Sequence, residues 1–273
     1  MMSYVAERPG VGVLLRDWRR RRRMTQLDLA FDAGVSARHL SFIETGRSRP
    51  SAEMIKHLAA ELDLPLRERN ELLLAGGYAP AYGQRSLNAP EMGPVRDAMD
   101  SVLAGHEPYP AVVVDRHWGL VAGNRAVGLL TEGVADHLLE PPVNVLRLSL
   151  HPDGLAPRIT NFGEWRAHIL DRLRRQSAAS GDPALTALHE ELRALPDGVS
   201  VEEPDLAAGE IAVPLRLRHN GGELSFVSTI TTFGTAVDIT VSELSIEAFF
   251  PATAGTAEAV RIWARNIPAF PSG

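Results

Sequence analysis

The chain has 273 residues, of which 45% are hydrophobic and 23% charged, values close to the average for globular proteins. This length fits one large domain or two ordinary ones. No apolar run approaches the roughly 18 residues of a membrane span, and no apolar core precedes a cleavage site near the N-terminus, so we expect neither an anchor nor a signal peptide. The sequence has no cysteine, which excludes disulfides, thiolate nucleophiles and thiolate metal sites. A cytoplasmic protein fits these observations best.

Charge is distributed unevenly along the chain, whose net charge is −6. Residues 1–82 carry 13 Lys and Arg against 10 Asp and Glu, and five consecutive arginines occupy positions 19–23. The other 191 residues carry 15 basic and 24 acidic side chains. Such asymmetry predicts a nucleic-acid-binding head on an acidic body that does not bind DNA. The arginine run by itself is explained equally well as the solvated end of a helix.

The first 75 residues predict a compact all-α domain of five short helices. Apolar side chains recur at helical spacing, and capping residues and glycines mark the helix ends. In the first helix, for example, Val11, Leu15 and Trp18 share one face. The four helices that follow begin at Thr25, Ser36, Ser51 and Pro65.

A stretch rich in Pro, Gly, Asn and Tyr, residues 78–94, predicts a linker between a first domain, 1–77, and a second, 95–273. In the second domain, two short strands, several helices, a hairpin and a last strand predict an α+β fold with a five-stranded antiparallel sheet and helices over one face. The sequence His-Asn-Gly-Gly at 219–222 marks the hairpin turn. The expected strands are 111–114, 120–121, 211–218, 223–233 and 244–250, and the expected helices are 95–103, 124–130, 165–176, 183–195 and 256–265. Such a fold can hold a small molecule between its layers.

The segment from Thr25 to Pro50 carries the strongest functional signal. A capped helix, a turn at 33–35 and a second capped helix form a helix-turn-helix, which places its second helix in the major groove of DNA. Residues 11–75 closely resemble the lambda-repressor-like domain of the XRE family. The residues that fit the family pattern are Gln26, Leu29, Ala30, Gly34, Ile43, Glu44, Gly46, Arg47, Pro50 and Ser51. The resemblance implies a buried ion pair between Arg19 and Glu44 that builds the domain and does not read DNA.

We expect the helix at 37–44 to enter the major groove. The predicted DNA-binding residues are Gln26, Ser36, Ala37, Arg38, Ser41, Phe42, Arg47 and Arg49. Arg38 can donate two hydrogen bonds to a guanine, worth about 1–3 kcal/mol of discrimination, and Ala37 or Phe42 could contact a thymine methyl group. The residues at 26, 47 and 49 are placed to hold phosphates. In the alternative interpretation, Phe42 packs against a neighbouring helix and Arg49 is a solvated loop residue.

Five stretches give the second domain a pattern of its own. They are YPAVVVDRHW at 109–118, NVLRLSLHPDGLAPRITNFGEWR at 144–166, GDPAL at 181–185, VPLRLR at 213–218 and IEAFFP at 246–251. They resemble the ligand-binding domain of MmyB-like regulators, a PAS-like module that follows an XRE head. The resemblance implies a transcription regulator whose second domain senses a small apolar or fatty molecule.

The second domain contains the aromatic and polar side chains that a mostly apolar pocket requires. The predicted ligand-binding residues are Trp118, Asn124, Arg147, His151, Asn161 and Trp165. Arg147 could pair with a ligand carboxylate, because a guanidinium binds one bidentately. The alternatives are that Asn161 caps a helix or holds a loop, that Trp165 belongs to the core and that Arg147 pairs with an internal acid.

Sequence patterns of catalysis and metal binding are missing. The chain has no G-x-S-x-G elbow, Walker A loop or G-x-G-x-x-G fingerprint, and its nine histidines lack metal-ligand spacing. The sequence His-Pro-Asp-Gly at 151–154 favours a turn over an acid–base pair. We therefore expect no enzyme, no metal and no cofactor other than a bound fatty acid or similar small apolar ligand.

These observations predict a transcriptional regulator that binds a double-stranded DNA operator as a homodimer, with its operator affinity modulated by a small-molecule effector and no membrane partner. In an alternative interpretation, the second domain is a ligand-free module for dimerisation or protein interaction. A third, in which the domain turns over its ligand, lacks the nucleophile and metal patterns that it would need.

Overall fold

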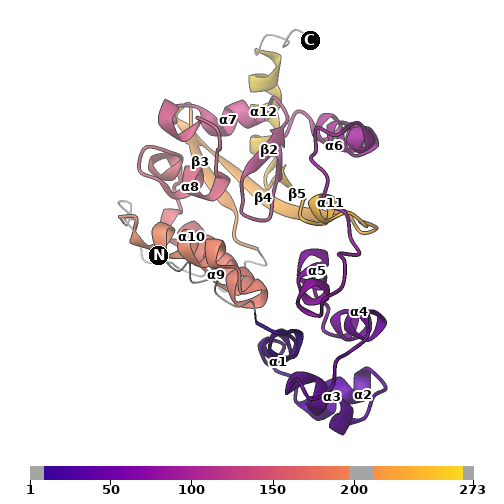
Figure 1. Cartoon of the computed structure of the whole chain (residues 1–273). Helices are drawn as coiled ribbons and strands as arrows, with labels where there is room; N and C mark the ends of the chain where they lie inside the picture. Colours follow the sequence, from indigo (N-terminus) through magenta and orange to yellow (C-terminus); the bar gives the residue numbers. More distant parts are fainter. Residues whose placement is uncertain (1–8, 197–211, 267–273) are drawn as a thin grey trace, which may run out of the picture. The chain divides into compact units, whose positions relative to one another are not determined.

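The computed structural model describes residues 9–196 and 212–266, and the chain divides into two compact units (Figure 1). The first unit comprises residues 1–87 and 234–242, and the second comprises 88–233 and 243–273. The boundaries expected from the sequence, at 77 and 94, differ from this division, because residues 78–87 and 234–242 belong to the first unit. Within the described part of the chain, no helix is long and apolar enough to cross a membrane.

The five predicted helices of the first unit are confirmed. They are α1 (Val11–Arg21), α2 (Gln26–Asp32), α3 (Ala37–Glu44), α4 (Ala52–Glu61) and α5 (Leu66–Ala75). The side-chain oxygens of Thr25, Ser36 and Ser51 each accept a hydrogen bond from the backbone N–H three residues further on, which satisfies an otherwise unpaired donor at the helix start. These local hydrogen bonds explain why the starts of α2, α3 and α4 could be predicted.

One apolar core holds the five helices together. Leu15, Leu29, Leu40 and Leu58 are among its fully buried side chains. Gly12 allows α1 to approach α3 closely, since a Cβ at this position would lie 2.2 Å from the carbonyl oxygen of Ile43. Any larger residue at position 12 would therefore push the two helices apart.

A buried ion pair joins α1 to the end of α3. Nε of Arg19 donates to Oε1 of Glu44 at 2.7 Å, and Nη2 donates to Oε2 at 2.8 Å. The hydrogen bonds to Glu44 raise the pKa of Arg19. Burial alone would raise the pKa of Glu44, but hydrogen bonds from Arg19 and Gln26 lower it below its usual value. The predicted ion pair is confirmed, and both groups are charged at neutral pH.

Two segments outside the five helices complete the first unit. The side chain of Asn70 makes three hydrogen bonds with the backbone of residues 78–87, the segment expected to be a linker. Arg85 of this segment forms an ion pair with Asp238 at 3.1 Å. Asp238 precedes the short helix α11 (Ile239–Ser242), which the sequence did not predict.

The second unit contains the expected five-stranded antiparallel sheet, in the order β2-β1-β5-β4-β3. The strands are β1 (Ala111–Val114), β2 (Leu120–Gly123), β3 (Leu215–His219), β4 (Gly222–Thr232) and β5 (Ser245–Pro251). Asn220 and Gly221 have φ angles of 48° and 78°, as the central residues of a tight hairpin turn require. The hairpin is therefore confirmed, while residue 211 of the predicted third strand lies outside the described residues.

Helices cover both faces of this sheet. They are α6 (Gly93–His106), α7 (Val127–Thr131), α8 (Val145–Leu150), α9 (Phe162–Ser180), α10 (Pro183–Ala194) and α12 (Ala254–Arg265). The side chain of Phe249 joins the main core with α7 to α10, whereas the ring of Phe250 lies 4.7 Å from that of His106 in α6. Because successive strand residues face opposite sides, α6 covers the other face, and the expectation of helices over one face only is wrong.

Removing the carboxylate of the buried ion pair should destabilise the first unit strongly. We expect Glu44→Gln to lower the free energy of unfolding by about 3 kcal/mol, because it leaves Arg19 charged and buried without its partner. Chemical unfolding of the full chain measures this loss. The matched control is Glu53→Gln, which removes the exposed ion pair with Lys56 and should change stability little.

The stabilisation by Glu44 should also depend on pH. Its pKa is lower in the folded than in the unfolded chain, so its contribution is complete above the ordinary pKa of Glu, about 4.3, and is lost as the pH falls through the folded value. The stability difference between the wild-type chain and Glu44→Gln should therefore shrink below about pH 4. A difference that stays constant down to acid unfolding would contradict this assignment.

Candidate DNA-binding and ligand-binding sites

Helix α3 is buried on one side and open on the other. Leu40, Ile43 and Glu44 are buried, whereas Arg38 is exposed and Phe42 is partly exposed. The guanidinium carbon of Arg38 lies 5.3 Å from the centre of the Phe42 ring, within the range of a cation–π contact. This contact restrains the long Arg38 side chain on the open face, beside Ser41.

Three of the other predicted DNA-binding residues build the domain. Gln26 donates a hydrogen bond to Oε2 of Glu44 at 2.8 Å and so joins the buried ion pair. The Ser36 hydroxyl caps α3, and Ala37 packs against the core. Their side chains therefore hold α2 and α3 in position within the domain.

The two arginines after α3 differ from one another. Arg49 donates a hydrogen bond to the carbonyl oxygen of Gly76 at 3.0 Å, and its guanidinium lies 5.6 Å from the ring centre of Tyr78. Arg47 is exposed and makes no hydrogen bond or ion pair within the described residues. Arg49 is exposed as well, but Arg38 and Arg47 are the predicted arginines that make no hydrogen bond to other groups within the described residues.

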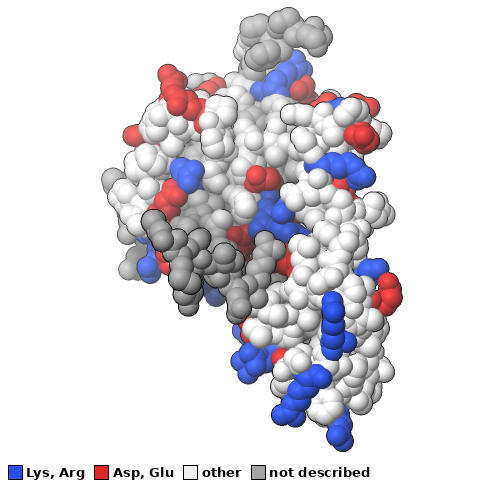
Figure 2. Space-filling model, in the orientation of Figure 1, with Lys and Arg blue, Asp and Glu red and all other residues white. Residues whose placement is uncertain are grey.

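Charge supports the assignment of this unit as the DNA-binding one. Figure 2 shows Lys and Arg side chains standing out from the part of the surface that Figure 1 assigns to α1–α4, with few acidic side chains between them. Positive side chains attract the phosphate backbone and supply the sequence-independent part of DNA affinity.

The second unit encloses an apolar cavity of about 160 Å³. Its walls come from the sheet and from α7, α8 and α9, with side chains such as Val112, Leu148 and Phe249. Leu120 and Leu139 also line the cavity, and they are 36% and 37% exposed. These two leucines thus line the cavity and also reach the surface of the protein.

A single charged pair interrupts the apolar lining. Nη1 of Arg172, on α9, donates to Oε1 of Glu247, on β5, at 3.3 Å. The guanidinium carbon of Arg172 lies 4.2 Å from the centre of the Trp118 ring. Its Nε and Nη2 atoms are buried and have no hydrogen-bond partner within the described residues. Unsatisfied buried donors are costly, so Arg172 is an incompletely paired cation in the cavity lining.

Only one of the six predicted ligand-binding residues, Trp165, lines the cavity, where its Nε1 donates to Oγ of Ser149 at 2.9 Å. Trp118 lies behind Arg172, and its Nε1 donates to Gln176. Arg147 is outside the cavity, paired with Glu191 at 2.6 Å. Their hydrogen bonds raise the pKa of Arg147 and lower that of Glu191, as the interpretation of an internal acid partner requires.

The remaining three residues hold loops outside the cavity. Asn124 accepts a hydrogen bond from the backbone N–H of residue 111 and donates to the carbonyl oxygens of residues 103 and 109. Asn161 joins the start of α9 to the backbone of residues 214 and 216. Nδ1 of His151 accepts a hydrogen bond from the N–H of Asp153 at 3.0 Å.

Arg172 and Glu247 are not among the ligand-binding residues predicted from the sequence. A signal for Arg172 was present, because Trp165, Ile169 and Arg172 follow at intervals of four and three and hence share one face of α9. Glu247 had no such signal. Its position on β5 faces the cavity only because of the strand register with β1, where it is paired with Val112.

Two family models match the chain. The model of the MmyB-like transcription regulator ligand binding domain matches residues 95–262, and a helix-turn-helix model matches residues 15–69. The chain belongs to the MmyB-like transcription regulators. It is a DNA-binding transcriptional regulator with a helix-turn-helix domain and a ligand-binding domain, and both resemblances expected from the sequence are confirmed.

Shorter matches with two relatives agree with this assignment. An uncharacterized HTH-type transcriptional regulator of Bacillus subtilis (strain 168), RghRB, is 37% identical over 103 residues, which are 37% of this chain and 66% of the relative. The ImmF control region 10 kDa protein of Bacillus phage phi105 is 34% identical over 77 residues, which are 27% of this chain and 86% of that protein. The chain thus spans about two thirds of the first relative and most of the second.

The structural role of Asn124 and the exposed position of Arg147 can be tested by measuring the free energy of unfolding. We expect Asn124→Ala to lower the free energy of unfolding by about 3 kcal/mol, because it removes the partner of three backbone groups in buried or partly buried hydrogen bonds. Arg147→Ala removes an exposed ion pair and should cost less than about 1 kcal/mol. Urea unfolding of both full-length variants measures the difference, and equal losses would contradict these roles.

Proposed function

We propose that α3 enters the major groove of a double-stranded DNA operator, where Arg38 reads a base and Arg47 contacts a phosphate. The exposure of Arg38 on the open face of α3, whose opposite face is buried, carries this proposal. The chemistry supports it, since a guanidinium can donate two hydrogen bonds to guanine. Gln26 and Arg49 hold phosphates less readily than the sequence implied, because each already has a partner in the domain.

Substitution of the two arginines should separate base reading from phosphate binding. We expect Arg38→Ala to cost about 1–3 kcal/mol on the best operator and to relax specificity at one base pair. Arg47→Ala should weaken binding to all sequences alike and reduce the salt slope by about one. Titrations of operator variants at several salt concentrations test both effects. Identical profiles for the two variants would refute the division of roles.

We propose that the protein binds its operator as a homodimer in the cytoplasm. One small helix-turn-helix offers few base contacts, and dimers of this motif bind two half-sites about one helical turn, or 34–36 Å, apart. Sedimentation of the full chain with and without a palindromic operator tests this state. One chain bound per operator at saturation would contradict it.

We propose that the cavity binds a small apolar molecule with an acceptor group at one end, such as a fatty acid, and that Arg172 meets that group. The place of Arg172 in the cavity lining carries this proposal, and it is supported by two donor atoms of Arg172 that have no partner within the described part of the chain. The cavity volume is about 160 Å³. An engineered apolar cavity of roughly 150 Å³ in another protein binds benzene. A ring or short chain fits inside, and a longer chain would extend past Leu120 and Leu139 toward the surface.

Such a ligand would regulate DNA binding by linkage. If the ligand binds one conformation of the protein more tightly, it shifts the population toward that conformation and changes operator affinity by the same coupling free energy. Organic extraction and mass spectrometry of the purified protein would identify a co-purifying molecule. Operator affinity unchanged by every ligand that fills the cavity would refute the regulatory part and favour a dimerisation or protein-interaction module.

The role of Arg172 predicts a preference for acids over alcohols. We expect the wild-type chain to bind octanoate about 10-fold more tightly than octanol, because a hydrogen bond to a charged group contributes about 1.5 kcal/mol or more. Arg172→Gln, which removes the cation, should remove this preference. Arg147→Gln is the matched control outside the cavity and should retain it. Calorimetry with octanoate and octanol measures this preference. An equal loss of the preference in Arg172→Gln and Arg147→Gln would contradict the assignment.

A further inference from the structure

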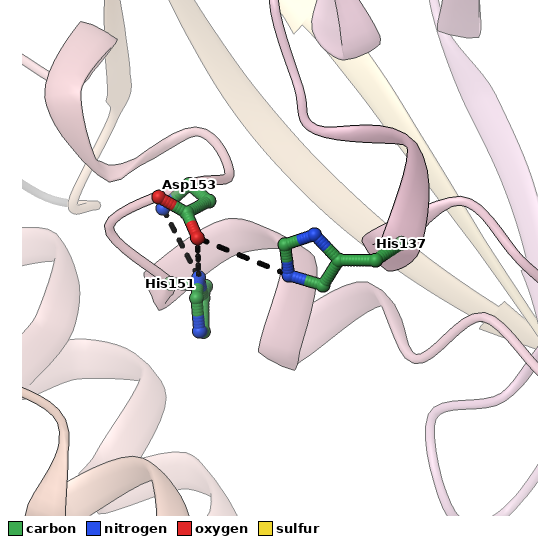
Figure 3. A group of neighbouring side chains, drawn as sticks. All are labelled: His137, His151 and Asp153. Carbon is green, nitrogen blue, oxygen red and sulfur yellow. Dashed lines mark hydrogen bonds and ion pairs between the residues drawn. The ribbon is translucent and has the colours of Figure 1, made fainter.

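A cluster of possible metal ligands lies in the second unit, apart from the cavity lining. Figure 3 shows His137, from the 3₁₀ helix η2 (Asp136–Leu138), facing His151 and Asp153 from the turn after α8. One ligand atom from each residue lies within 4.8 Å of the other two. Nε2 of His137 and Nδ1 of His151 are each 3.9 Å from Oδ2 of Asp153. We propose that these three residues bind a divalent transition-metal ion such as Zn²⁺.

The donor set selects this class of ion. Two imidazole nitrogens and one carboxylate oxygen are ligands that zinc and its neighbours in the first transition series accept, with water in the fourth position. Calcium and magnesium prefer oxygen donors, and the cluster provides only one carboxylate. The histidines are 14 positions apart in the sequence, which is why their spacing gave no metal signal.

The two nitrogen–oxygen separations are close to those of a bound site. Bonds of about 2.1 Å at tetrahedral angles place neighbouring ligand atoms about 3.4 Å apart, so each observed distance of 3.9 Å must shorten by about half an ångström. The side chains of His137 and Asp153 are 57% and 60% exposed. Both can therefore rotate toward an ion without disturbing the core.

The backbone already fixes the two segments relative to each other. The N–H of Ala135 donates to the carbonyl oxygen of Asp153 at 3.0 Å, which joins the segment carrying His137 to the turn. The turn itself packs against α8, since a Cβ on Gly154 would lie 2.1 Å from the carbonyl oxygen of Leu148. The folded backbone thus already holds the ligand-bearing segments together, so less conformational entropy is lost when an ion binds.

The tautomer of His151 suits metal binding. Its Nδ1 accepts a hydrogen bond from the N–H of Asp153 at 3.0 Å, so this nitrogen is assigned as the unprotonated one, with a lone pair, and the proton is assigned to Nε2. An ion at Nδ1 would replace that hydrogen bond and leave an amide at the surface, where water can satisfy it. The exchange leaves no polar group unpaired inside the protein.

Zinc titration of the untagged full chain, after treatment with EDTA, tests the proposal. We expect calorimetry to give one ion per chain and the melting temperature to rise with zinc, because an ion that binds only the folded state stabilises it. His137→Ala and Asp153→Asn should each reduce the affinity by at least 10-fold. His189→Ala, which removes a partly exposed histidine of α10 outside the cluster, is the matched control and should bind zinc like the wild type.

Cobalt provides a second readout that does not depend on stability. Co²⁺ held by two imidazoles and a carboxylate should give visible absorption bands that His137→Ala and His151→Ala remove and His189→Ala keeps. Failure of the wild-type chain to bind one ion, or equal binding by His137→Ala, would overturn the proposal. Neither result bears on the cavity ligand or on DNA binding, since no cluster residue lines the cavity.

Discussion

The ion pair between Arg19 and Glu44 fixes the helix that we propose to read DNA. It is buried and bidentate, so separating the partners would leave a charge in the core at a large cost. Gln26 extends the pair to α2, and Gly12 allows α1 to reach the carbonyl end of α3. These buried contacts therefore fix the position of the open face of α3.

The arginine in the cavity lining of the second unit, Arg172, is less completely paired than Arg19. Arg172 pairs with Glu247 and lies over the Trp118 ring, yet two of its donor atoms have no partner among the described residues. Unpaired buried donors lower the stability of a fold. We propose that an acceptor group of the ligand pairs with Arg172, in which case binding would offset this cost.

The sequence alone determined the family, the helix-turn-helix and most elements of the sheet domain. These depend on interactions between residues close in the chain: a capping hydroxyl and the N–H three residues on, or the turn at Asn220 and Gly221 between alternating strands. The resemblance also implied the pair of Arg19 and Glu44. Residue types and local spacing are enough for such features because their partners lie within one turn or one motif.

Tertiary structure alone decided which side chains meet at the sites. Arg147 and Arg172 are the same residue type, but Arg147 is held outside the cavity by Glu191 and Arg172 is brought into it by the face of α9. Strand register decided that Glu247 faces the cavity, and packing of the turn after α8 placed Asp153 beside His137. Contacts between residues distant in sequence depend on how whole helices and strands pack against each other. A sequence pattern does not give the distances between residues on different elements.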